Sequence, residues 1–358
     1  MKKFLKIVGG AICTVLLIVA IYVAYVFIDY DRIEDNQDLS VNSSSTVKTD
    51  AVPIGQELQV TSWNIGFGAY TDEYSFFMDG GKYSRGFSEE IVSDTLDQIT
   101  ADLESFDSDF YLIQEVDTDA TRSYHINQYN IVTKSFTHMD KVYAQNYDSP
   151  YLFYPILEPH GKSQAGIVTM SNSNISSALR RSLPIQDGFA KFLDLDRCYS
   201  ISRLDVEGGK ELVLINFHLS AYSSDPAVAQ NQLAMLYDDI KAEYEKGNYV
   251  ICGGDFNKDL LGDSSAIFGV SGKNYSWAKP FDYDAVPDGF TVVAPYDETN
   301  PVPSCRNADK PWSAATNFQL TIDGFIISDN VELIKSNVVD LQFACSDHNP
   351  VYMNFVLK

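Results

Sequence analysis

The stretch Tyr-Val-Ile-Cys-Gly-Gly-Asp-Phe-Asn at residues 249–257 indicates the architecture of this chain. Its uninterrupted apolar run is typical of a strand that is buried on both faces, as in a sheet covered by helices. Two glycines then lead into Asp255 and Asn257, so polar side chains follow where the strand ends. Taken alone, these residues are typical of a turn. A buried carboxylate is costly unless it is paired or binds a ligand, so a functional site is the alternative.

Apolar runs elsewhere in the chain predict further buried strands, at residues 58–64, 110–116, 165–170, 211–219, 320–327 and 351–357. Apolar residues at helical spacing predict helices over 92–103, with Ser88 as the N-cap, and over 229–240, with Asp225-Pro226 before the helix and Gly247 after it. Some strands follow one another closely enough to form hairpins. The pattern therefore predicts a four-layered α/β sandwich of two mixed β-sheets flanked by helices, rather than a barrel.

Composition permits a large folded domain and limits its partners. The chain has 358 residues, of which 45% are hydrophobic and 21% charged, so a sizeable core is available. The net charge is −23, and because the first 28 residues contain three lysines and no acid, the remainder carries −26. Such a domain repels phosphate backbones, which argues against a metal-free DNA binder and against a stable nucleic-acid partner. Solubility at a cell surface explains the charge more simply.

The five cysteines do not have the spacing of a zinc cluster. Cys13 lies in the apolar N-terminal segment, and the other four would permit two disulfides in an exported domain, with three possible connectivities: Cys198, Cys252, Cys305 and Cys345. A free buried thiol is equally ordinary. The pairing therefore stays open at this stage.

The N-terminus predicts a membrane anchor. Residues 1–6 are basic and would be cytoplasmic, and residues 7–28 contain no charge. As a helix this run is about 33 Å long, enough for a bilayer core of about 30 Å. The acidic flank after it favours an extracytoplasmic location for the rest of a single-pass cell-membrane protein. A cleaved signal peptide and a buried cytoplasmic helix are the alternatives. Residues 29–56 would be a polar stalk, and residues 57–358 the main domain.

Polar residues recur at the ends of the predicted strands. They are Asn64, Glu115, His218, Asp255 with Asn257, Asp323, and Asp347 with His348. Each alone is compatible with a turn or a solvated strand end. Together they would place carboxylates, amides and histidines at one rim, and oxygen ligands of this kind suit a hard divalent cation. The histidines could transfer protons, and the amides could donate to phosphoryl oxygens.

These segments, in this order, resemble the motifs of the endonuclease/exonuclease/phosphatase superfamily, whose members include deoxyribonuclease I-like enzymes. The resemblance rests on Trp-Asn at 63–64, Gln-Glu at 114–115, Gly-Asp-Phe-Asn at 254–257 and Ser-Asp-His at 346–348, and it covers roughly residues 57–358. It implies Mg²⁺ or Mn²⁺ as the cofactor. The implied metal ligands are Asn64, Glu115 and Asp347.

The resemblance also implies catalytic roles. Asp255 would position or deprotonate the attacking water, and Asn257 would contact the phosphate. His348 would act as a general base or stabilise the transition state, oriented by Asp323. His218 occupies a position that is histidine in the deoxyribonuclease and sphingomyelinase branches.

Substrate recognition is expected to involve residues outside these motifs. Many relatives carry an arginine after the strand at 166–170, where this chain has Ser171-Asn172, so Lys162 is a candidate replacement. Arg85 and Arg122 lie in other candidate loops.

The expected function is phosphodiester hydrolysis, on extracellular nucleic acid or a phospholipid headgroup. The alternatives are a phosphomonoesterase for sugar or inositol phosphates, and a catalytically inactive surface binding module. The oligomeric state stays open.

Overall fold

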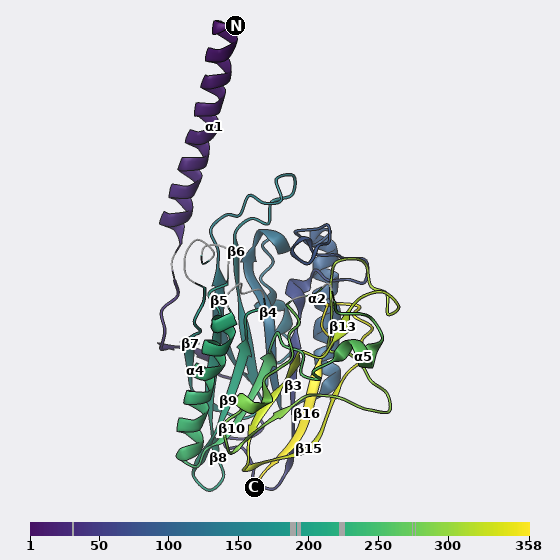
Figure 1. Cartoon of the computed structure of the whole chain (residues 1–358). Helices are drawn as coiled ribbons and strands as arrows, with labels where there is room; N and C mark the ends of the chain where they lie inside the picture. The colour runs from purple at the N-terminus through teal and green to yellow at the C-terminus, as the bar shows by residue number, and fades with distance from the viewer. Residues whose placement is uncertain (31, 187–190, 192–194, 222–225, 274, 276) are drawn as a thin grey trace.

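The computed structural model describes the chain except residues 31, 187–190, 192–194, 222–225, 274 and 276. Two seven-stranded mixed sheets pack face to face (Figure 1). The strands of the first sheet are, in spatial order, β1 (Gln37–Asp38), β7 (Ile175–Ser182), β8 (Cys198–Val206), β9 (Lys210–His218), β10 (Tyr249–Asp255), β14 (Asp323–Ser328) and β11 (Phe290–Val293).

The second sheet is mixed as well, since β3 and β4 run parallel, as β9 and β10 do in the first. Its strands are β15 (Val331–Val338), β16 (Val351–Leu357), β3 (Glu57–Asn64), β4 (Phe110–Ala120), β6 (Ser163–Ser171), β5 (Asp140–Asp148) and β2 (Val41–Asn42). A short ribbon pairs β12 (Cys305–Arg306) with β13 (Gln319–Leu320). The helices are α1 (Lys2–Asp29), α2 (Glu89–Phe106), α3 (Gln128–Val132), α4 (Pro226–Glu245) and α5 (Ser264–Phe268).

Three apolar layers hold the sandwich together. Leu112 of β4 and Leu214 of β9 belong to the core between the two sheets. On the outer face of the second sheet, Leu96 of α2 belongs to the same buried cluster as Ile113 of β4. On the outer face of the first, Ile240 of α4 shares a cluster with strand residues such as Val213 and Ile215. Alternate residues of one strand thus face opposite layers, which explains the continuous apolar runs and confirms the four-layered sandwich.

Each of the predicted strand runs falls in a strand, except that the run at 320–327 is divided between β13 and β14. The hydroxyl of Ser88 caps α2 by accepting from the Ile91 N–H, as predicted. Asp225, predicted to start the next helix, lies outside the described residues. The sequence pattern missed β5, β7, β8, β11 and β15. In β15, for example, most side chains are exposed or half-buried, so no apolar run marks it.

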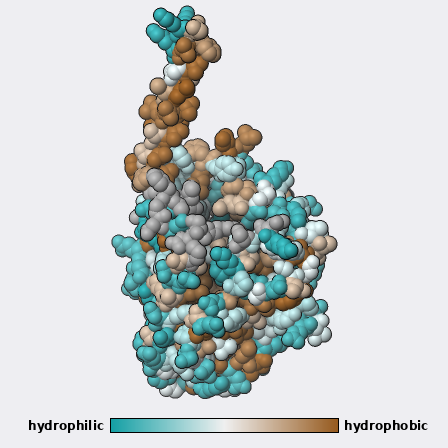
Figure 2. Space-filling model, viewed as in Figure 1, coloured by the Kyte–Doolittle hydropathy of each residue, from teal (hydrophilic) through white to brown (hydrophobic). Residues whose placement is uncertain are grey.

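The helix α1 extends away from the sandwich, and its side chains are almost all exposed (Figures 1 and 2). By length and composition it is able to cross a membrane, a test that a signal sequence also passes. The segment after it is not the free stalk that its polar composition predicts. Its strands β1 and β2 pair with β7 and β5, and Val52 is buried. The edges of both sheets offer unpaired backbone groups, and this segment pairs with them.

All five cysteines are free thiols in the structure, and the four in the domain are buried. The two disulfides that the count permits are not formed.

Candidate active site

Three neighbouring strands of the first sheet bring polar side chains to the same level. In the pairing register, Asp255 at the end of β10 stands opposite His218 at the end of β9 and opposite Asp323 at the start of β14. Because β9 and β10 are parallel, their carboxyl ends meet at one edge of the sheet. From the second sheet, β3 contributes its last residue, Asn64, to the same region.

Gly254 allows β10 to reach this position. Its φ is +151°, and a Cβ at this residue would stand 1.9 Å from the carbonyl oxygen of Phe217 in β9. No side chain fits there, so the Gly-Gly pair before Asp255 is a requirement of the local packing.

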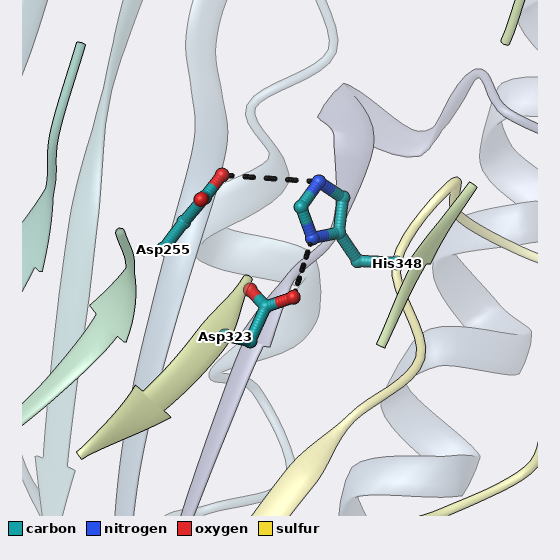
Figure 3. A group of neighbouring side chains, drawn as sticks. All are labelled: Asp255, Asp323 and His348. Atoms are coloured by element: carbon teal, nitrogen blue, oxygen red, sulfur yellow. Dashed lines mark hydrogen bonds and ion pairs between the residues drawn. The ribbon is translucent and has the colours of Figure 1, made fainter. Parts of the chain in front are cut away.

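His348 lies between two carboxylates (Figure 3). Its Nδ1 is 2.9 Å from Oδ2 of Asp323, and its Nε2 is 3.8 Å from Oδ2 of Asp255. The hydroxyl of Ser304 donates to the same Asp323 oxygen at 2.7 Å. The indole N–H of Trp63 donates to the His348 carbonyl at 2.9 Å, which fixes the backbone that carries the ring. The imidazole is therefore held from both its ring and its main chain.

The two histidines of the site, His348 and His218, have pKa values that are shifted in opposite directions. Burial opposes the charged imidazolium of His348, but the adjacent Asp323 carboxylate outweighs it and holds the pKa of His348 well above its ordinary value. Burial lowers the pKa of His218 well below its ordinary value, and Arg197 and His348 lower it further. One histidine is thus held protonated and the other neutral.

Asp255 is buried between these histidines. Burial raises its pKa to about 7, with His348 opposing and Asp323 reinforcing the shift. Its Oδ2 is 3.5 Å from Nε2 of His218. Its Oδ1 accepts from the backbone N–H of Asn257 at 2.7 Å. A carboxylate that titrates near neutral pH suits proton transfer.

Glu115 points into the site from a distorted strand. Its φ is +57°, unusual for a non-glycine residue, and the register between β4 and β6 shifts between Ile113 and Val116. Such a bulge redirects a side chain and is common beside active sites. The amide nitrogen of Asn64 donates to Glu115 at 3.1 Å and to Asp255 at 3.3 Å, while its oxygen accepts from Gly66. In this orientation Asn64 bridges two carboxylates and does not offer them an oxygen.

Glu115 and Asp347 both line the cavity that adjoins these groups. In the described part of the chain, neither has a lysine or arginine within ion-pair distance. Burial raises the pKa of Asp347 to about 6, and although His348 opposes the shift, the negative charge of Glu115 adds to it. Two carboxylates that repel each other at a partly buried site fit a divalent cation such as Mg²⁺ or Mn²⁺.

A second group with suitable donors is Asp255, Asp323 and His348, whose ligand atoms lie within 4.8 Å of one another. There Nδ1 of His348 already contacts Asp323. Among the described residues, Glu115 and Asp347 have no such contact with a histidine, so their carboxylates are the better candidates to hold a cation.

Asn257 also lies at the cavity, in a left-handed conformation with φ of +50°. Its amide nitrogen donates to the Leu219 carbonyl at 2.8 Å, which leaves one amide hydrogen for another acceptor. Strained backbone at both Glu115 and Asn257 is a feature of functional sites.

The three basic residues predicted to bind substrate lie in different places. Arg122 lines the cavity, but its guanidinium makes two hydrogen bonds to Asp117 and stacks on Phe67. Arg85 and Lys162 do not line it. Arg85 donates to the Pro159 carbonyl, and Lys162 is 3.3 Å from the Asp29 carboxylate. Position in sequence could not distinguish a loop that faces the cavity from one that packs elsewhere.

The cavity has a volume of about 450 Å³ and is also lined by groups outside the predicted set of site residues. Arg197, Cys305 and Arg306 line it, and Sγ of Cys305 is 3.6 Å from Nε2 of His348. Much of the remaining wall is aromatic, from Phe67, Tyr70, Phe76, Phe77 and Tyr154. Most of these residues belong to long connecting segments, whose packing no periodicity reveals.

The model of the Endonuclease/Exonuclease/phosphatase family matches residues 61–348. The chain therefore belongs to this family, as its motifs indicate. A comparison with curated protein sequences found no match.

Several solved structures share the fold. An endonuclease/exonuclease/phosphatase from Beutenbergia cavernae DSM 12333 is 17% identical, with a TM-score of 0.54, over 84% of this chain and 72% of that one. ANGEL2, described as a 2′,3′-cyclic phosphatase in complex with adenosine-2′,3′-vanadate, is 16% identical (TM-score 0.55; 84% and 96% covered). TDP2 of D. rerio, complexed with a single-strand DNA product, is 15% identical (TM-score 0.52; 84% and 99% covered). At these identities the likeness concerns the fold.

Proposed function

We propose that this protein is a metal-dependent phosphodiesterase, anchored in the cell membrane by α1, with its catalytic domain outside the cell. The proposal rests on one observation: Glu115, Asp255, Asp347 and His348, from separate strands and loops of both sheets, line a single cavity, and Asp323 contacts His348 from outside that lining. Family membership supports hydrolysis of phosphate esters. Two of the structural neighbours, whose complexes contain adenosine-2′,3′-vanadate and a single-strand DNA product, are consistent with it.

Different residues of the site have different roles in the hydrolysis, in which water adds to phosphorus. A new P–O bond forms to the water oxygen, the ester P–O bond breaks, and the proton of the water ends on the leaving alcohol. Asp255, with its pKa near neutral, accepts a proton from the attacking water. The protonated His348 stabilises the negative charge that develops on the phosphoryl oxygens, and Asp323 keeps it protonated and oriented.

Two other polar groups complete the site. His218 is neutral and lines the cavity, and its Nε2, 3.5 Å from Oδ2 of Asp255, can donate to that carboxylate. The remaining amide hydrogen of Asn257 is a donor for a phosphoryl oxygen. Bound by Glu115 and Asp347, Mg²⁺ or Mn²⁺ would neutralise phosphate charge and polarise the ester. These assignments keep the roles expected from the motifs, except that Asn64 positions Glu115 and Asp255.

Hydrolysis of bis-p-nitrophenyl phosphate by the purified chain tests the proposal. We expect turnover with Mg²⁺ or Mn²⁺, loss of activity with EDTA, and recovery when the metal is restored. A lower rate on p-nitrophenyl phosphate distinguishes a diesterase from a phosphomonoesterase. An inert protein across these metals and both esters would favour a binding module.

The variant His348→Ala should lower kcat by about 10²- to 10³-fold, as loss of a donor that stabilises transition-state charge does. His125→Ala is the matched control, because that histidine is exposed and pairs with Asp119 outside the cavity. Equal rates for His348→Ala and the parent would refute the role of His348.

A further inference from the structure

The loop that joins β5 to β6, residues 149–162, carries exposed apolar side chains at its tip. The exposed fractions of Phe153, Ile156 and Leu157 are 56%, 83% and 100%. Single exposed apolar residues are ordinary, but several large ones on one protruding tip mark an interaction surface. The loop rises from the end of the sandwich from which α1 leaves, and apolar surface gathers at that end (Figures 1 and 2).

The base of this loop is held firmly to the domain. Leu152 and Gly161 exchange two backbone hydrogen bonds of 3.0 Å, which makes the loop a short hairpin extension. The guanidinium of Arg85 donates to the Pro159 carbonyl at 2.6 Å, and the backbone N–H of Ser84 donates to the Glu158 carboxylate at 3.2 Å. The apolar tip is therefore presented outward by an anchored base.

The same loop contacts the end of α1. The hydroxyl of Tyr22 donates to the Tyr151 carbonyl at 3.0 Å, and the Tyr151 N–H donates to the hydroxyl of Tyr25 at 2.9 Å. The ring of Phe153 lies 5.1 Å from that of Tyr22, edge to face. Lys162, at the foot of the loop, pairs with Asp29. The loop and the last two turns of the helix thus form one unit.

These contacts determine the position of the loop along α1, and therefore its depth in a bilayer that α1 spans. Tyr22 precedes the helix end at Asp29 by seven residues, which corresponds to about 10 Å along the axis. Phe153, beside Tyr22, lies at the same level. If α1 spans a bilayer, this level is the boundary between headgroups and acyl chains, where amphipathic elements bury their apolar faces about 5–10 Å deep.

The loop also forms part of the active-site cavity. Leu152 and Tyr154, on either side of Phe153, line the cavity, together with Phe77 and Met78. The rings of Tyr154 and Phe77 are 5.8 Å apart. The apolar rim of the cavity is therefore continuous with the part of the loop that contacts the membrane helix.

We propose that the tip of this loop inserts into the outer leaflet of the bilayer spanned by α1, and that the cavity takes the phosphodiester of a phospholipid from that leaflet. The apolar rim suits the first carbons of lipid chains, and the polar floor suits the phosphate. The charge of −26 outside the anchor disfavours the competing substrate, a nucleic acid. The substrate assignment depends on the phosphodiesterase activity proposed above, whereas insertion of the loop does not.

A fluorescence measurement tests insertion without reference to activity. The full chain with Cys13→Ala is reconstituted in phosphatidylcholine vesicles, and a polarity-sensitive dye is attached at Leu157→Cys or, as a control, at Ile334→Cys. Ile334 is an exposed apolar residue on β15, with 47% exposure. We expect a blue-shifted emission and quenching by spin-labelled lipid at position 157 and neither at 334. Equal, unquenched emission at both positions would overturn the proposed insertion.

A paired activity assay tests the substrate. The variant Phe153→Ser/Ile156→Ser/Leu157→Ser is compared with the parent and with Leu333→Ser/Ile334→Ser. Each is assayed on bis-p-nitrophenyl phosphate and on vesicles of phosphatidylcholine, phosphatidylethanolamine, phosphatidylglycerol and sphingomyelin. We expect the triple variant to lose at least tenfold on vesicles and to match the parent on the soluble diester, because its three side chains do not line the cavity. The β15 variant should match the parent on both.

Each other outcome counts against a specific statement. A parent that cleaves the soluble diester but no lipid refutes the lipid substrate and leaves the phosphodiesterase proposal intact. A parent inert on both refutes the phosphodiesterase proposal, and the fluorescence result then decides insertion alone. Equal lipid hydrolysis by parent and triple variant refutes a role of the loop in substrate access.

Discussion

At the scale of single residues, the site depends on charges that would be unfavourable in isolation. Asp323 is surrounded by apolar strand residues and is buried, yet its Oδ2 has two partners, Ser304 and His348. Burial alone would expel the proton from the imidazole of His348, and the adjacent carboxylate reverses that preference. The protonation state of His348 is therefore a property of the pair.

Replacement of Asp323 by Asn should alter the pH dependence of hydrolysis. Without the carboxylate, the pKa of His348 falls, so the imidazolium deprotonates at a lower pH. The alkaline limb of the kcat–pH profile on bis-p-nitrophenyl phosphate should move to lower pH, and kcat at its maximum should fall. Ser304→Ala retains the carboxylate and should leave the limb near its original place. An unshifted limb in the Asp323→Asn variant would separate His348 protonation from catalysis.

At the scale of secondary-structure elements, close packing of strands and helices delivers the site residues to one level. The β9–β10 pair brings His218 beside Asp255, and this pairing depends on the absence of a side chain at Gly254. On the outer face, α4 is attached to β8 through Glu243, whose carboxylate lies 2.6 Å from Arg203 and 2.8 Å from Lys246.

Gly254→Ala should destabilise the fold strongly. The added methyl group would overlap the Phe217 carbonyl, so the strands must separate, at a cost of about 3 kcal/mol or more in free energy of unfolding. Gly262→Ala is the control: it also has positive φ but nothing within 4 Å of its Cβ, so it should cost only about 1–2 kcal/mol of backbone strain. Urea unfolding of the two variants measures the difference. Equal midpoints would contradict the steric argument.

The Glu243 ion pairs should contribute an acid-sensitive part of the stability. The hydrogen bond from Arg203 lowers the pKa of Glu243 from 4.5 to about 2. A lowered pKa means that this stability is complete above pH 4.5 and is lost as the pH falls towards 2. Glu243→Gln should therefore be less stable than the parent by about 2 kcal/mol at pH 7. The difference in Tm should shrink to near zero at pH 2, and a constant difference across this range would exclude the assignment.

At the scale of the whole molecule, the two sheets hold the site at one end of the sandwich, and α1 leaves from the end that bears the β5–β6 loop. The segment between α1 and the domain pairs with the edges of both sheets, so α1 is attached closely to the domain. Contacts of Tyr22, Tyr25 and Asp29 with the loop limit how the domain can orient on a membrane.

The anchor proposal makes a prediction about location. The full chain should remain in the membrane fraction after a carbonate wash, because 22 uncharged residues hold it there. Protease added outside intact cells should digest the domain. Release of a soluble, shortened chain would instead identify residues 7–28 as a cleaved signal sequence, and protection from protease would contradict the orientation.

The sequence by itself determined the layers and the identity of the central polar residues. Buried strands read as apolar runs because both faces are covered, and Asp255 and His348 stand out because charged groups are costly beside such runs. The tertiary structure alone decided how the loops are used. It turned Arg85 and Lys162 towards the β5–β6 loop and α1, paired Arg122 with Asp117, and brought Ser304 to Asp323. Such contacts depend on long-range packing of irregular segments, which have no repeating pattern from which a position in space can be inferred.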